Sequence, residues 1–568
     1  MRKGFMAIAL VASAGLAVSN GARADDVPTN NRSSLRDPLP DSLTLGGVTV
    51  YGTIDIGYAY QSNGVPLSSK YLGGLEYQSF TTTRNFSGSQ STVAESGLEQ
   101  SKIGVRVELP IGGDFKVIGR AETGFNPLSG QLVDACGSIA DNAGVAQGKQ
   151  TANADSSRCG QAFNSVAYGG ATSKTFGTLT IGRQQSLQLD ALVLYDPQTL
   201  AYAFSFLGYS GFDAGSGSTE AARWDNSVKY VFQYGPAHAA FMYSNGGEDT
   251  GLLNHAYGAD VGATLFGVSV DAVYQKENGA VNLRSSFDDV PNPLPAPGLA
   301  AYISNDDAWN LMGKYTFDFA AADPGAKPGA SPKLTVFAGY SHIRKAHSSD
   351  SYGASQGDYP LSIGININDP AKYNFEWIGA KFALPPNWSF TAAFYHTTQN
   401  SWTIGLNSTG YQGIGCVDAG LLCAGSFTEA STVVDYAFDK HFDLYAGVNW
   451  SEVKAGLANG FVGTTADGTT GSEIRRPRWW AGGCGSNRWR AAPCPTGRSS
   501  SGARIRAQHR SRVRAHFRRR AAAEAASRRS PAARALRGSR ERRRCPARGR
   551  QASRRIRRSR PSRRHARG

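Results

Sequence analysis

The sequence predicts an all-β fold, a transmembrane antiparallel β-barrel, and three observations lead to this prediction. Residues 100–125 form two runs in which apolar and polar side chains alternate, joined by a Pro/Gly/Asp turn, and a period of two is typical of β-strands. Fifteen such runs follow one another with almost no helical pattern between them. Their connections are alternately short and long, as in transmembrane barrels. A secreted soluble β protein is the alternative, but its loops would not divide by side so consistently.

Each expected strand is placed by its own alternation and by the turn beside it. The first strand, 48–60, follows a polar leader at 25–47 and precedes a long polar loop. After the 100–125 hairpin, six more hairpins are predicted at 163–171 with 178–183, 226–234 with 237–244, 256–266 with 268–276, 307–319 with 334–343, 373–384 with 388–396, and 426–439 with 442–453. The long connection 184–222 is too apolar and aromatic to be a plain solvated loop.

The first 24 residues are predicted to be a secretory signal peptide. Positive residues at 2–3 precede an apolar run at 5–18, and an A-x-A motif at 22–24 fits a cleavage site, so the exported chain is expected to begin near Asp25. The apolar run is too short for a membrane-spanning helix, and no later stretch is apolar enough for one. Membrane insertion is therefore expected as a barrel, because only helices and closed barrels satisfy every backbone group in lipid.

The charge divides the chain into an acidic body and a basic tail. Thirty-two of the 60 Lys and Arg residues follow Glu473, all of them Arg, against two acidic residues, so this segment carries +30. The rest holds 28 basic and 42 acidic residues and carries −14. We expect residues 48–454 to form the barrel, 455–474 its last extracellular loop, and 475–568 an Arg-rich disordered tail.

The change in composition near residues 472–475 is abrupt. Lys vanishes after it, and Arg, Ala, Ser, Pro and Gly dominate, as an out-of-frame reading of a GC-rich gene would give. We therefore expect a frameshift that replaced the sixteenth strand, with an evolved basic appendage as the rival explanation. Bacterial single-chain barrels have even strand numbers, so a missing closing strand would leave an open sheet edge in lipid. A chain of that kind is expected not to assemble.

Two close pairs of cysteines lie in long loops of the body. Cys136 and Cys159 share one loop, and Cys416 and Cys423 share another. In an exported chain such pairs predict disulfides. Zinc is the weaker interpretation because neither loop offers His residues at ligand spacing. No metal site and no cofactor is predicted.

Several stretches of the body resemble one known family in both their residues and their order along the chain. These are VTVYGTIDIGYAY, QSKIGV, ETGFNPLSG, FGTLTIGRQ and RWDNSVKY, spread over roughly residues 43–454. They closely resemble the general porins of Gram-negative bacteria. The resemblance implies a 16-stranded barrel, a homotrimer in the outer membrane among lipid and lipopolysaccharide, and passive diffusion of small hydrophilic solutes. It also implies that the third long loop, 184–222, folds into the barrel and narrows the pore.

The same resemblance, with the strand alternation, suggests which charges line the constriction. Lys102, Arg183 and Arg223 match basic positions of the family, whereas Arg106 and Arg120 share the lumen face by alternation alone. The candidate acids of the loop are Asp190, Asp196 and Asp213. Basic and acidic groups facing each other across a pore would sort solutes by charge. Asn164 stands where many family members carry Arg, so one wall charge is expected to be absent.

Three other functions are alternatives to a general pore. The only nucleophile-like motif, G-x-S-x-G at 353–357 around Ser355, lies in a loop and not between a strand and a helix, so no enzyme is predicted. The Arg-rich tail would bind nucleic acid non-specifically, but this conflicts with export, so no specific nucleic acid partner is predicted. A substrate-selective channel, for a sugar or an organic anion, stays open because selectivity depends on geometry at the constriction.

Overall fold

The structure is a computed structural model of the 568-residue chain. It describes residues 44–61, 90–142, 158–209, 222–246, 252–284, 299–319, 331–348, 355–356, 359–363, 366–400, 403–405, 424–439, 441–455 and 474–486. The chain divides into two compact units, Met1–Arg490 and Ala491–Gly568, and every described residue belongs to the first. The expected signal peptide and nearly all of the Arg-rich tail lie outside the described residues.

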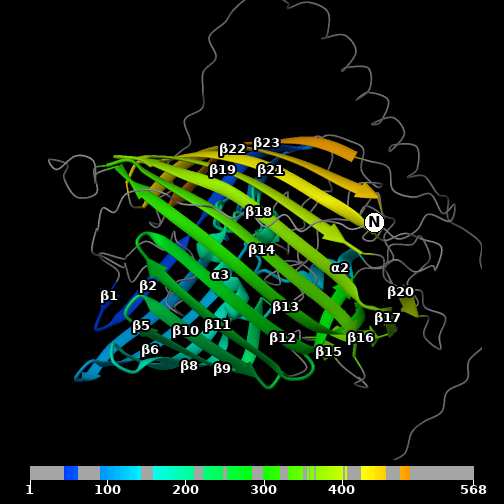
Figure 1. Ribbon diagram of the computed structural model, residues 1–568, viewed down its shortest axis with the longest axis horizontal. Coiled ribbons are helices and arrows are strands. Elements are labelled where there is room, and N and C mark those ends of the chain that lie inside the picture. The colour runs from blue at the N-terminus through cyan, green and yellow to red at the C-terminus, as the bar shows by residue number, and fades with distance from the viewer. Residues whose placement is uncertain are drawn as a thin grey trace, which may run out of the picture. The chain divides into compact units, whose positions relative to one another are not determined.

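The first unit is built on one antiparallel sheet of sixteen strands, each paired with the next along the chain (Figure 1). This confirms the all-β barrel fold predicted from the sequence. Strands one and two each consist of two segments. In chain order the strands are β2 and β3 (Val48–Thr53, Asp55–Gln61), β4 and β5 (Gln90–Glu95, Lys102–Gly112), β6 (Phe115–Gly124), β7 (Val166–Ser173), β8 (Gly177–Gln185), β9 (Arg223–Tyr234), β10 (Ala237–Ser244), β11 (Ala256–Leu265), β12 (Val268–Arg284), β13 (Leu299–Asp318), β14 (Lys333–His347), β18 (Ala371–Leu384), β19 (Trp388–Gln399), β21 (Gly425–Ala437), β22 (Phe442–Ala455) and β23 (Ile474–Ser486).

The last of these strands closes the sheet into a barrel. The backbone of β23 pairs antiparallel with β22 on one side and with β3 on the other, and Figure 1 shows it in orange beside yellow β22. The expectation that no sixteenth strand follows residue 474 is therefore wrong, and the barrel extends to Ser486 instead of ending near residue 454. Apolar and polar side chains do not alternate along β23. Its pairing depends instead on backbone N–H and C=O groups, which bond those at the free edges of β22 and β3.

Each strand has two different faces. Apolar side chains are exposed on the outer face, and the side chains of the inner face are buried inside the barrel. In β10, His238 and Met242 are buried, whereas Phe241 is 57% exposed on the opposite face. The same alternation recurs around the sheet, so the outer surface is a band of apolar side chains. Near the short turns, the rings of Trp388 and Tyr436 lie 4.6 Å apart, which is typical of an interfacial aromatic girdle.

The short connections are tight turns. Between β11 and β12 only Phe266 and Gly267 lie outside the strands, and both have positive φ, at 55° and 84°. Two consecutive positive φ values define the type I′ turn, whose twist matches that of paired strands. Gly267 suits the second position because it has no Cβ to clash.

The short strand β1 (Thr44–Leu45) precedes the first barrel strand and pairs with β2. The remaining elements belong to the long connections and are α2 (Ala135–Asn142), α3 (Leu187–Tyr195), α4 (Phe206–Tyr209), β15 (Ser355–Gln356), β16 (Tyr359–Ile363), β17 (Asn366–Asp369) and β20 (Thr403–Gly405). Among the described residues, no helix combines the length and the apolar character needed to span a membrane.

The helix α3 lies in the connection between β8 and β9, and all nine of its residues are buried. Its sequence, LQLDALVLY, is apolar on nearly every side, and a helix of this kind is stable only when it is surrounded. It contacts β10, β11, β12, β13 and β14, and Figure 1 shows it among these strands. Ser186 begins the helix by accepting a hydrogen bond from the Leu189 N–H at 3.3 Å.

Candidate functional site

The segment 186–209, which contains α3 and α4, is held to the barrel wall on several sides. Six strands supply side chains that hydrogen-bond it: Lys229 of β9, Ser269 of β12, Trp377 of β18, Tyr395 of β19, Ser431 of β21 and Asn449 of β22. These strands lie around most of a closed sheet. A segment that reaches all of them crosses the interior of the barrel and narrows it.

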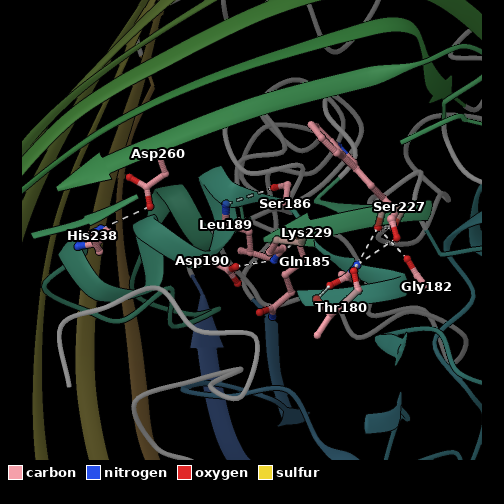
Figure 2. A network of polar contacts seen from close by, with 12 residues as sticks. Thr180, Gly182, Gln185, Ser186, Leu189, Asp190, Ser227, Lys229, His238 and Asp260 are labelled. Carbon is pink, nitrogen blue, oxygen red and sulfur yellow. Dashed lines mark hydrogen bonds and ion pairs between the residues drawn. The ribbon is translucent and has the colours of Figure 1, made fainter. Parts of the chain in front are cut away.

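Asp190, the acid in the first turn of α3, is paired with a lysine of the wall. Lys229 Nζ lies 2.6 Å from Asp190 Oδ2 and donates also to the Gln185 carbonyl oxygen at 2.6 Å, as Figure 2 shows. Burial raises the pKa of Asp190, while the positive charges of Lys229 and Arg120 act in the opposite direction. The loop acid and the basic wall are therefore close enough to interact electrostatically.

Asp196, at the end of α3, acts as an anchor of the segment. Tyr395 donates its hydroxyl to Asp196 Oδ1 at 2.5 Å, and the Leu200 N–H donates to Asp196 Oδ2 at 2.6 Å. Burial raises the pKa of this carboxyl, and the same hydrogen bonds oppose the shift. One oxygen thus joins the end of α3 to β19, and the other holds the turn that follows the helix.

A cluster of basic residues lies on the inner face of the first strands. Arg106 of β5 and Arg120 of β6 stand directly opposite each other, and their guanidinium groups lie 5.4 and 5.2 Å from the centre of the Tyr51 ring. Arg120 also donates to the Tyr51 hydroxyl at 2.6 Å and to Glu122 at 2.5 Å. Tyr51 in turn donates to Glu122 at 2.8 Å, so three side chains form a closed network.

Gly104 makes the position of Tyr51 possible. The two residues are cross-strand partners, and a Cβ on Gly104 would lie only 2.5 Å from the end of the Tyr51 ring. The ring therefore lies across β5, where it contacts Arg106, and reaches Arg120 on the next strand, β6. The family-like motif QSKIGV contains this glycine, but the sequence alone does not show which ring covers it.

The other basic residues predicted from the sequence are separated from this cluster. Lys102 is buried and pairs with Glu99 at 2.6 Å. Arg183 is buried between Asp225, at 2.8 Å, and the Asn164 carbonyl oxygen, at 2.7 Å. Arg223 is buried at the start of β9, opposite Gln185. The structure thus spreads the predicted basic residues along the wall, each beside different neighbours.

Asn164, where the family resemblance suggests a missing Arg, has a structural role. Its side-chain amide accepts from the Gly124 N–H at 2.8 Å and donates to the Gly124 carbonyl oxygen at 2.9 Å. The side chain is fully buried and carries no charge. It ties the end of β6 to the segment that enters β7.

The loop that contains α2 is closed by a disulfide between Cys136 and Cys159, as expected from the sequence. The Arg158 carbonyl oxygen accepts from the Ala135 N–H at 2.9 Å, so the backbone is also paired beside the bridge. The other predicted pair, Cys416 and Cys423, and the candidate acid Asp213 lie outside the described residues.

Sequence reasoning missed Lys229, Tyr51 and Glu122, which are direct partners of the predicted residues Asp190 and Arg120. A signal for Lys229 was present, because it alternates with Ser227 and Val231 and therefore shares the inner face of β9. Its partner was not visible, since Asp190 lies 39 residues earlier and belongs to a different element. Tyr51 and Glu122 have no sequence signal of their own beyond their strand positions.

A closed antiparallel barrel whose interior is polar and is narrowed by an inserted segment has the architecture of a membrane channel. The family model described as Gram-negative porin matches residues 6–456. The chain therefore belongs to the Gram-negative porin family, and it is a channel of the bacterial outer membrane.

Solved structures with similar folds share little sequence with this chain. An anion-selective porin from Comamonas acidovorans is 14% identical with a TM-score of 0.44, covering 77% of this chain and 98% of its own. The trimer form of OmpT, an outer membrane protein of Vibrio cholerae, is 13% identical with a TM-score of 0.44, over 77% and 98% of the two chains. Salmonella typhi OmpF in complex with daunomycin is 12% identical with a TM-score of 0.41, over 78% and 98%. No curated protein sequence matches the chain.

Proposed function

We propose that this porin lets small hydrophilic solutes and ions diffuse passively through a water-filled channel, and that Arg106 contributes the main positive charge felt by ions at the constriction. The channel is formed by the barrel, and the segment 186–209 narrows it. Lys102, Arg120, Arg183, Arg223, Asp190 and Asp196 are proposed to shape the constriction with Arg106.

The observation that supports the role of Arg106 is its lack of a carboxylate partner among the described residues. Lys102, Arg120, Arg183 and Lys229 each lie within 2.8 Å of a carboxylate oxygen, so their fields are largely cancelled nearby. Arg106 instead stacks over Tyr51, is half-buried, and has an Nε atom without a hydrogen-bond partner in the described part of the chain. An uncompensated charge acts over a longer range than a paired one.

The test is the reversal potential across a planar bilayer that separates two KCl concentrations. Arg106→Glu should shift the reversal potential towards that of a more cation-selective pore. Lys116→Glu is the matched control, because it makes the same charge change on the same hairpin at a position that is 49% exposed near the short turn. If the reversal potential shifts no more for Arg106→Glu than for Lys116→Glu, Arg106 does not supply the main positive charge at the constriction.

We propose in addition that the functional form is a homotrimer embedded in lipid and lipopolysaccharide, as the family resemblance implies. Trimers would place three independent channels side by side. Light scattering of the detergent-solubilised protein, corrected for bound detergent, measures the assembly directly. A protein mass of one chain in all folded material would contradict the trimer.

A further inference from the structure

Three ligand-type side chains meet on the inner wall, near Asp190 of α3 and outside the group formed by Arg106, Arg120 and Tyr51. They come from neighbouring strands: His238 from β10, Asp260 from β11 and Asp271 from β12. His238 and Asp271 are both cross-strand neighbours of Gly262, so His238, Gly262 and Asp271 form one row across the sheet. Asp260 lies two positions before Gly262 on the same face of β11.

The distances within this group suit a single small cation. His238 Nε2 lies 3.2 Å from Asp271 Oδ1 and 3.7 Å from Asp260 Oδ2, and the ligand atoms all lie within 4.8 Å of one another. A tetrahedral ion bound at about 2.0–2.2 Å holds its ligand atoms about 3.3–3.6 Å apart. Small movements of the two carboxylates would bring all three atoms into that range.

The backbone at the centre of the group is open because Gly262 has no side chain. A Cβ at this position would lie 1.6 Å from Asp271 Oδ1 and 2.5 Å from His238 Cε1. Any other residue would push both ligands away from the row. The glycine therefore allows the imidazole and the carboxylate to meet over the middle strand.

In the described part of the chain, the polar atoms of the group are buried and have no hydrogen-bond partner outside the group, and within it His238 Nε2 makes the two ion-pair contacts given above. These atoms are His238 Nε2 and all four carboxylate oxygens of Asp260 and Asp271. The side chains of both aspartates are fully buried, and that of His238 is 2% exposed. Two buried carboxylates are costly unless a cation compensates them.

From this geometry we propose that His238, Asp260 and Asp271 bind one divalent transition-metal cation, with Zn²⁺ as the best match. One imidazole nitrogen with two carboxylate oxygens favours zinc over calcium or magnesium, which prefer ligand sets made only of oxygen. A neutral imidazole and two carboxylates also balance the charge of a divalent ion. Three protein ligands leave a fourth position for water.

The site lies on the part of the wall that α3 covers. The α3 residue Leu187 packs against Gly258, two positions before Asp260 on β11, and Figure 2 shows Asp260 and His238 close to this helix. A bound ion would join β10, β11 and β12 directly beneath the inserted segment. The ligand residues are separate from Arg106, so metal binding and ion selectivity are distinguishable properties.

The test is the zinc content of the folded full-length protein. Purified protein in detergent is incubated with ZnCl₂, desalted, and analysed by plasma mass spectrometry. Each of the variants His238→Ala and Asp271→Asn should bind fewer zinc ions than the unaltered protein, by about one ion per chain. His342→Ala is the matched control, because His342 bonds Asn374 through Nδ1 and belongs to no such cluster among the described residues. The difference between variants matters, since other Cys and His residues of the chain can also hold zinc.

A second measurement begins with the unaltered protein, so its first result does not depend on how the variants fold. Co²⁺ replaces Zn²⁺ in sites of this type, and a four-coordinate site of nitrogen and oxygen ligands gives visible absorption that hexaaqua Co²⁺ lacks. The folded protein should develop this absorption, and Gly262→Ala, which keeps all three ligands, should lose it. Equal zinc retention by His238→Ala and the unaltered protein, or no Co²⁺ absorption in the unaltered protein, would overturn the proposal.

Discussion

Lys229 Nζ lies 2.6 Å from Asp190 Oδ2, and the two side chains are 1% and 3% exposed. The contact joins β9 of the wall to the first turn of α3, inside the barrel. Because both groups are buried, removing one partner leaves the other charge without compensation. The pair therefore contributes both to the position of the inserted segment and to the stability of the barrel.

Lys229→Met should destabilise the barrel by about 3–5 kcal/mol, the usual loss when one partner of a buried pair is removed. The double variant Lys229→Met/Asp190→Asn should recover part of that loss, because no buried charge remains. Urea unfolding in detergent, followed by tryptophan fluorescence, measures both. If the double variant is as unstable as the single one, the two residues are not energetically coupled.

A second prediction concerns pH and the turn between β5 and β6. Asp114 Oδ2 accepts from the Ser173 hydroxyl at 2.7 Å and from the Thr175 N–H at 3.0 Å, which joins this turn to the one after β7. These bonds, the Ser173 hydroxyl first, lower the pKa of Asp114 below its usual 3.8. A lowered carboxyl pKa stabilises the fold above the unfolded-state pKa, and this stabilisation is lost as the pH falls through the folded-state value.

The denaturation midpoint should therefore fall less steeply below about pH 4 in Asp114→Asn than in the unaltered protein. Ser173→Ala should give an intermediate dependence, because it removes the first of the two hydrogen bonds. Urea midpoints measured from about pH 6 to about pH 3 make the comparison. Identical pH profiles for all three proteins would show that the carboxylate contributes nothing to folding.

A third prediction tests the closing strand. A chain that ends after Ser486 retains β23 and should fold into a barrel. A chain that ends after Gly471 lacks it, which leaves the edges of β22 and β3 unpaired at several kcal/mol per exposed backbone group in lipid. Heat-dependent migration in electrophoresis distinguishes folded barrels from unfolded chains. Equal folding of both truncated chains would mean that β23 does not close the sheet.

The frameshift origin of the Arg-rich segment stays a prediction, which resequencing of the gene near codon 473 tests. Because β23 is present, a frameshift would not leave the barrel open, as the sequence had suggested. If the out-of-frame residues still form a ladder with β22 and β3, the barrel is closed in spite of the altered sequence. Backbone hydrogen bonding explains this, because it does not depend on side-chain identity except at Pro477.

Alternation along the chain was enough to predict the fold. Runs such as that of β10 place apolar residues on one face whatever their identity, and short turns fix which strands are neighbours. The sequence of β23 has no such period, so its pairing depends on the two strands beside it. The helix α3 was anticipated only as an apolar connection, because nine residues that are apolar on nearly every side show no amphipathic period.

The candidate site was less predictable, for a physical reason. Alternation places Arg106 and Arg120 on one face. Their partners differ, however, and depend on the register of the neighbouring strands and on which side chain lies over a glycine. Tyr51 reaches Arg120 only because Gly104 leaves room. In the same way, His238 and Asp271 meet over Gly262, 33 residues apart and two strands away from each other.

The central claim is that this chain forms an open, water-filled channel narrowed by the segment 186–209. Single-channel recording of the folded full-length protein in a planar bilayer tests it most directly. We predict stepwise current increases with a conductance that is proportional to salt concentration and independent of voltage at low potentials. Folded protein, verified by its heat-dependent migration, that inserts and gives no current steps would contradict the account.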